Sequence, residues 1–201
     1  MKYLILAILI WCMAGTAPGA ETVKASSFGF KAENATECLR KAIDSGAKTV
    51  VLDNTGSDWI IDQVKLRSDL ELVIADGVTV RALPGAFKGQ NDCLFSAWEA
   101  RNLTLRGEGK ARLVMNKKDY QNAAEYKWSE WRHLISLRGC DNVKISNLIL
   151  ESSGGDGIYF GAGKTVKGCQ NVLLENLLIA RQYRQGISVI SAENLSIRKC
   201  R

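Results

Sequence analysis

Residues 142–150 read Asn-Val-Lys-Ile-Ser-Asn-Leu-Ile-Leu, and residues 171–179 read Asn-Val-Leu-Leu-Glu-Asn-Leu-Leu-Ile. In both stretches, apolar residues stand one, three, six and eight positions after the first asparagine. Shorter versions of the pattern begin at Asn102 and Asn194. A spacing of two within each apolar pair places the pair on one face of a β-strand. The pattern therefore predicts a repeated strand with one buried face.

The four asparagine-anchored segments recur at spacings of 40, 29 and 23 residues (142 − 102, 171 − 142 and 194 − 171). With insertions removed, the repeat is about 23 residues long, which falls in the range of stacked-repeat proteins. Each repeat holds several short strands and has no room for a helix, which favours a β-solenoid. Leucine-rich repeats also carry asparagines, but they need a denser leucine pattern than this chain has.

Small residues stand two positions before each anchoring asparagine, as a tight turn at the edge of a core requires. They are Ala100, Cys140, Cys169 and Ala192. Each asparagine is expected to stack on its neighbour at the strand spacing of about 4.8 Å and to satisfy backbone groups of the turn. Five cysteines follow residue 20, an odd number without a Cys-x-x-Cys pair, so we predict no zinc site. Their pairing is left open, although Cys140 and Cys169 would stack in adjacent coils.

A positive start, a short apolar run over residues 3–14 and small residues near residue 20 predict a secretory signal peptide over residues 1–20. A lipoprotein anchor through Cys12 is the alternative, but Trp11 is bulky for a lipidation site. No other segment is apolar over the length that a membrane span needs. We therefore expect a secreted or periplasmic protein in which residues 21–201 form a single domain.

The N-terminal part of that domain predicts a helix from about residue 35 to 45. Asn34 or Thr36 would cap it, one apolar stripe would face the core, and Gly46 would end it. Strands are expected over residues 49–52, 59–61, 70–74 and 78–80. The helix would cap the solenoid, whose terminal coil otherwise exposes its core. The sequence shows no such cap before Arg201, so we expect an N-terminal part of a longer solenoid.

The charge of the chain favours an anionic partner. Without Lys2 of the signal peptide, 26 basic and 21 acidic side chains remain (27 − 1 and 21), a net charge of about +5. A uronic-acid polysaccharide would suit this charge. Nucleic acid would suit it too, but export argues against that partner. We expect a monomer.

The chain resembles the N-terminal half of the pectate-lyase-like superfamily. The resemblance rests on the predicted helix, the strand in Gly46-Ala-Lys-Thr-Val50 and the asparagine-anchored coils, and it covers residues 25–201. Residues 153–159 (Ser-Gly-Gly-Asp-Gly-Ile-Tyr) and 184–191 (Arg-Gln-Gly-Ile-Ser-Val-Ile-Ser) resemble bacterial right-handed β-helix repeat proteins and, more loosely, polygalacturonases. The resemblance implies an all-β, right-handed parallel β-helix with an N-terminal capping α-helix. It also implies that sugar binds in a groove along one sheet.

The longest insertion, residues 112–132, is rich in aromatic and charged side chains. Rings stack on the apolar faces of sugars, and charges bind hydroxyls and carboxylates. We therefore predict that Tyr126, Trp128 and Trp131 bind substrate. The alternative is that these rings pack back onto the solenoid.

The repeat register predicts columns of neighbouring side chains. Setting Ile135, Ile158 and Ile187 level aligns three further columns. These are His133, Asp156 and Gln185; Arg132, Gly155 and Arg184; and the outward-facing Ser136, Tyr159 and Ser188. The carboxylate of Asp156 would raise the basicity of His133, the chain's single histidine, so that the pair could act as general acid or base. The arginines of the neighbouring column could bind a uronate carboxylate. The alternative is that both close a turn, because they share the parity of the inward isoleucines.

The sequence thus predicts a secreted protein that acts on a polysaccharide as a lyase or glycoside hydrolase. Its predicted catalytic residues are His133, Asp156 and Arg184, and its predicted substrate-binding residues are Arg132, Tyr159, Gln185, Trp128, Trp131 and Tyr126. Gln185 stands where polygalacturonases would place a histidine, and the acidic cluster of calcium-dependent lyases is missing. No cofactor or metal is therefore predicted, unless further coils supply calcium ligands. The alternative function is a non-catalytic glycan-binding or structural module.

Overall fold

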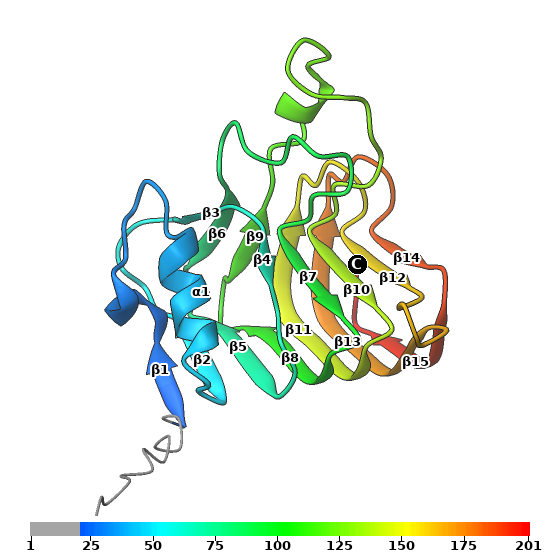
Figure 1. The fold of residues 1–201 in the computed structure, drawn as a ribbon, viewed down its shortest axis with the longest axis horizontal. Coiled ribbons are helices and arrows are strands. Elements are labelled where there is room, and N and C mark those ends of the chain that lie inside the picture. The colour runs from blue at the N-terminus through cyan, green and yellow to red at the C-terminus, as the bar shows by residue number, and fades with distance from the viewer. Residues whose placement is uncertain (1–20) are drawn as a thin grey trace, which may run out of the picture.

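The computed structural model describes residues 21–201, so the predicted signal peptide lies outside the described residues. The chain winds into stacked coils with three faces, and every pairing between its strands is parallel (Figure 1). The first face contains β1 (Thr22–Lys24), β2 (Thr49–Leu52), β5 (Leu70–Ile74), β8 (Arg101–Gly107), β11 (Asp141–Glu151), β13 (Cys169–Ala180) and β15 (Ala192–Arg198). The second face contains β3 (Trp59–Ile61), β6 (Thr79–Ala82), β9 (Arg112–Val114) and the last residues of β11 and β13. The third face is a separate sheet, the third sheet, which consists of β4 (Val64–Lys65), β7 (Phe95–Trp98), β10 (Ile135–Arg138), β12 (Ile158–Gly161) and β14 (Ile187–Val189).

Residues 142–150 lie in β11, which contributes to two faces because it bends in the middle. Its first half pairs with β8 and its second half pairs with β9. The bend falls at Asn147, which has a left-handed φ of 57°, and β13 bends likewise at Asn176, with a φ of 53°. Asparagine tolerates this conformation better than most residues. Each apolar pair of the repeat therefore belongs to a different face of the coil.

The apolar residues of the repeat fill the space enclosed by the three faces. In β11, the predicted core positions are at most 2% exposed: Val143, Ile145, Leu148 and Leu150. Their counterparts in neighbouring coils line up with them in register. The predicted buried face of the strand is thus confirmed, and the core runs as a continuous column along the stack.

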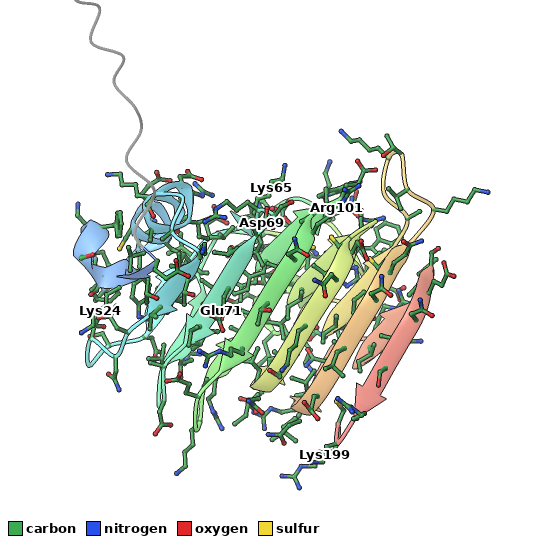
Figure 2. The ribbon with its side chains drawn as sticks, turned by 90° about the horizontal axis from the view of Figure 1, so that it is seen from below. Lys24, Lys65, Asp69, Glu71, Arg101 and Lys199 are labelled. Carbon is green, nitrogen blue, oxygen red and sulfur yellow. The ribbon has the colours of Figure 1, made fainter. Side chains whose placement is uncertain are left out.

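The anchoring asparagines all adopt left-handed φ angles of 52–54° at the turn into the first face. Their amides form a ladder: Asn102 Nδ2 donates to Asp69 Oδ1 at 2.7 Å, and Asn142 Nδ2 donates to Asn102 Oδ1 at 2.8 Å. Asp69 and Arg101 mark this edge of the sheet in Figure 2. Asn171 lies level with Asn142, as the predicted stacking requires, but at this step the hydrogen bond differs, because Asn171 Nδ2 donates to Asp141 Oδ1 instead of Asn142.

Substitution of Asn142 separates the two roles of these asparagines. Asn142→Ala is expected to lower the free energy of unfolding by about 1–2 kcal/mol, because it strains the left-handed backbone and removes the ladder bond. Asn142→Gly keeps the backbone conformation and removes only the bond, so it should cost about half as much. Urea unfolding of both variants measures the difference, and equal losses would show that backbone strain is not involved.

A single α-helix, α1 (Thr36–Asp44), lies beside the first strands at the N-terminal end of the described stack (Figure 1). Its buried stripe contains Cys38 and Leu39, and Gly46 follows it with a φ of 80°, as predicted. The Asn34 side chain accepts the Thr36 amide at 3.0 Å, while Ala35 occupies the capping position. That α1 acts as a cap stays a prediction. The structure adds two short 3₁₀ helices, η1 (Ala25–Phe28) and η2 (Asp119–Gln121).

No helix among residues 21–201 has the length and apolar character to cross a membrane. All five cysteines of this part of the chain are free thiols. Cys140 and Cys169 lie in adjacent coils as predicted, and the Cys140 amide donates to Cys169 Sγ at 3.4 Å.

Candidate functional site

The outer face of the third sheet carries a pocket of about 500 Å³. Its floor is formed by side chains of β7 and β10, and its rim comes from the segments that precede β4, β7 and β10. The lining residues are Gln63, Asn91, Cys93, Ser96, Trp98, Trp131, His133, Ser136 and Arg138. They include two tryptophans, one arginine and several uncharged polar groups. No aspartate or glutamate belongs to the lining.

His133 reaches this pocket because the chain bends just before β10. The predicted register is confirmed, since Ile135 pairs with Ile158 and Ile158 with Ile187. However, Leu134 and Ile135 are both completely buried, which breaks the strand alternation at this point. His133 therefore lies on the same side of the sheet as Ser136, and the expectation that it shares the inward parity of Ile135 is wrong.

The imidazole of His133 is 1% exposed and stacks on Tyr159, with ring centroids 4.8 Å apart and planes inclined by 12°. The backbone amide of Asp156 donates to His133 Nδ1 at 2.9 Å. A backbone amide can only donate, so this bond places the proton of the neutral ring on Nε2. Nε2 has no hydrogen-bond partner among the described residues.

The structure places Asp156 beside His133, as predicted, but the net pKa shift of the histidine is opposite to the one expected. Its carboxylate Oδ2 lies 3.5 Å from Nδ1, and this charge alone would raise the histidine pKa. Removal of the ring from water is the larger effect, and nearby Arg138 and Arg184 act in the same direction as burial. The pKa of His133 is consequently lowered to about 4, so the ring is neutral at physiological pH.

This lowered pKa gives a prediction that the chain's single histidine makes easy to test. The Hε1 resonance of His133 should titrate near pH 4 in the folded protein, whereas an unfolded histidine titrates near pH 6.5. The unfolded chain then binds a proton before the folded one does, so stability should fall as the pH is lowered below about 6.5. The expected loss between pH 7 and pH 5 is about 2 kcal/mol.

Proton NMR measures the pKa, and urea unfolding at both pH values measures the loss. The variant His133→Gln should lack this part of the pH dependence. A resonance that titrates above pH 6 would contradict the burial argument.

Asp156 and Arg184 lie close to each other, and neither belongs to the lining of the pocket. Asp156 is completely buried, and its Oδ1 accepts the Gln185 amide at 3.1 Å. Arg184 Nε lies 3.9 Å from Asp156 Oδ1 and 3.5 Å from Glu130 Oε2. The structure thus brings the predicted catalytic residues together, but the carboxylate has no solvent-exposed surface. Burial of His133 and Asp156 favours the alternative in which they close a turn.

Tyr159 lies on the outer face of β12, level with Ser136 and Ser188, as the register predicted. Gln185 is exposed, and its Oε1 accepts the Ser188 hydroxyl at 2.8 Å. Sequence reasoning missed Trp98 and Arg138, which stand two residues further along the same outward columns of β7 and β10. Extending the predicted columns by one alternation would have found both residues.

The insertion supplies one predicted sugar platform to the pocket and keeps the others away from it. Trp131 lines the pocket and is 43% exposed. Trp128 is 65% exposed but lies at a separate cavity of about 130 Å³. Tyr126 is buried, with Lys88 Nζ 3.9 Å from its ring centre, so its prediction as an open platform is wrong.

Arg132 also departs from its predicted role. Its side chain is completely buried and donates to the carbonyls of Phe87 at 2.8 Å and Lys127 at 2.9 Å. The guanidinium therefore ties the insertion to the preceding loop and has no surface in the pocket. Cys93 does line the pocket, where burial raises the pKa of its thiol to about 11 and keeps it protonated.

Across residues 21–201, no three histidine, cysteine or acidic side chains cluster as a metal site would require. The possibility of calcium bound with help from further coils stays a prediction.

No protein-family model and no curated protein matches the sequence. Solved structures do match. A glycosyl hydrolase candidate from Parabacteroides merdae has a TM-score of 0.70 and 16% identity, over 90% of this chain and 95% of that one. An iota-carrageenase complexed to iota-carrageenan fragments has a TM-score of 0.67 and 17% identity, over 94% and 44%.

A polygalacturonase from Erwinia carotovora has a TM-score of 0.59 and 16% identity, over 92% of this chain and 63% of the enzyme. The chain thus spans less than half of the carrageenase and under two thirds of the polygalacturonase. At these identities the likeness concerns the fold. The chain has the right-handed parallel β-helix fold of the pectate-lyase-like proteins.

Proposed function

We propose that this chain belongs to a secreted carbohydrate-active protein that binds a polysaccharide in the pocket of the third sheet and acts on it. The observation that supports the proposal best is the composition of that pocket. Trp98 and Trp131 expose ring surface to it, and Arg138, Ser96 and Ser136 add polar donors. Aromatic rings beside a few well-placed polar groups are what sugar recognition requires.

The shape of the site fits an extended ligand. Parallel strands place equivalent residues of successive coils about 4.8 Å apart, so the outer face of the third sheet repeats along the stack. Ser96, Ser136 and Ser188 with Tyr159 form one such outward row. A polymer chain that crosses several coils can contact this row at several units. The structural neighbours include proteins named as a carrageenase and a polygalacturonase, which supports a polymer over a small sugar.

The two candidate reactions require different chemical groups. A hydrolase needs two carboxyl groups that flank the scissile bond, whereas a lyase needs a base that removes a proton next to a carboxylate. Asp156 is buried, and the pocket lining contains no carboxylate. That lining favours the second candidate function, a non-catalytic glycan-binding module. Either reaction would require groups beyond this lining.

Product analysis tests the proposal. The purified protein is incubated with neutral and anionic polysaccharides, and mass spectrometry identifies the products. Unsaturated oligosaccharides would establish a lyase, and water-added oligosaccharides would establish a hydrolase. Binding without cleavage would establish the second candidate. If the protein neither binds nor cleaves any polymer of the panel, the proposed function is refuted for these polymers.

A further inference from the structure

Arg138 is held between two aromatic rings on the outer face of the third sheet. Its Cζ lies 5.2 Å from the ring centre of Trp98 on β7 and 4.7 Å from that of Tyr159 on β12. Strands β7, β10 and β12 are consecutive in the sheet (Figure 1). The two rings therefore stand on opposite sides of the guanidinium. Such cation–π contacts orient a guanidinium and cover its faces, while its N–H edges remain available.

A glycine on the neighbouring strand makes room for this arrangement. Gly161 lies level with Arg138 in the register, and a Cβ added there would come within 2.7 Å of Tyr159 Cε1. The ring of Tyr159 therefore leans over Gly161 into the space that a side chain would fill. Three adjacent strands contribute to the clamp: a tryptophan, the arginine and a glycine that accommodates the tyrosine.

The charge of Arg138 is not neutralised within the described part of the chain. None of the ion pairs there includes Arg138, whereas Arg106 pairs with Glu71 and Arg112 pairs with Glu151. The pocket around it offers hydroxyls and amides and no carboxylate. Three observations thus coincide at one residue: an oriented guanidinium, free donors and the absence of an internal acid. Each is what an external anion would need.

We propose that Arg138 is the residue that selects an acidic sugar unit, whose carboxylate or sulfate ester binds the N–H edge of the guanidinium. The inference rests on the proposed function and adds the substrate class. Trp98 and Tyr159 position Arg138, and the Ser96 and Ser136 hydroxyls lie in the same pocket for sugar hydroxyls. A carboxylate accepts two parallel N–H donors from a guanidinium, and a sulfate can do the same.

Paired polymers that differ only in charge provide the test. Polygalacturonate is compared with its methyl ester, and iota-carrageenan with the same polymer after chemical desulfation, by affinity electrophoresis and calorimetry. The wild type should bind one anionic polymer about 10- to 100-fold more tightly than its neutral counterpart. The variant Arg138→Gln should lose this preference, and Arg138→Lys should keep part of it. The matched control Arg101→Gln removes an exposed arginine on β8, away from the pocket, and should keep it in full.

The polymer pair that shows the preference identifies the anion as carboxylate or sulfate. A preference that survives in Arg138→Gln, or equal binding of charged and neutral polymers by the wild type, would overturn the selective role of Arg138 while leaving the proposed function intact. Failure of the wild type to bind any of the four polymers would refute the proposed function for them, and the inference with it. Thermal melting of the Arg138 variants checks that they are folded.

Discussion

Replacement of Arg132 with methionine is expected to lower the free energy of unfolding by about 3 kcal/mol, because it leaves the buried Phe87 carbonyl and the part-buried Lys127 carbonyl without their donors. Arg132 is completely buried, and it donates to the carbonyls of Phe87 and Lys127 with a longer contact of 3.5 Å to that of Lys88. Methionine preserves much of the buried volume but none of the donors. For a domain of this size the loss corresponds to a melting temperature lower by roughly 6–12 °C.

The same substitution should release the insertion from the body of the solenoid. Arg132 connects the loop around Phe87 to the end of the insertion at Lys127, and the Gln90 side chain adds a bond to the Trp128 carbonyl at 2.8 Å. Limited proteolysis should therefore cut residues 116–131 faster in Arg132→Met than in the wild type. Arg101→Met, at an exposed position, should stay within about 0.5 kcal/mol of the wild type. Similar stability of both variants would show that the buried bonds of Arg132 contribute little.

The sequence was sufficient to predict the coil, because the coil depends on local alternation and on register. Leu148 and Leu150 had to be buried if the strand alternates, and Ile135, Ile158 and Ile187 had to align if the repeat stacks. The three-sided shape of the coil was harder to predict, although the sequence contains a pattern that marks the bends between faces. Asparagine recurs five residues after Asn142 and after Asn171, at the two positions where the strands bend.

The candidate site was predicted less well, because it depends on contacts between segments far apart in the sequence. The local sequence around Arg132 and Tyr126 does not show whether their side chains face solvent or the interior. The distant carbonyl of Phe87 decides that Arg132 points inward, and Lys88 covers Tyr126. Likewise, burial outweighs the carboxylate next to His133, and strand alternation cannot reveal that. Trp98 and Arg138 were within reach, since they follow the predicted outward columns.

Loss of Trp98 is the change expected to affect ligand binding most. Trp98 is 43% exposed, lines the pocket and flanks Arg138, so Trp98→Ala removes a stacking surface and one side of the arginine clamp together. A tryptophan that contacts the ligand often contributes about 2 kcal/mol or more to binding, which corresponds to a loss of affinity of roughly 30-fold or more. The free energy of unfolding should change by less than about 1 kcal/mol, because the ring packs on the surface of the sheet.

The matched control is Trp128→Ala, which removes an equally large and more exposed ring outside the pocket and should leave the affinity unchanged. Calorimetric titration with the polymer that the wild type binds most tightly measures the affinity of both variants. A larger loss of affinity in Trp128→Ala than in Trp98→Ala would show that the polymer binds at the insertion and not at the third sheet.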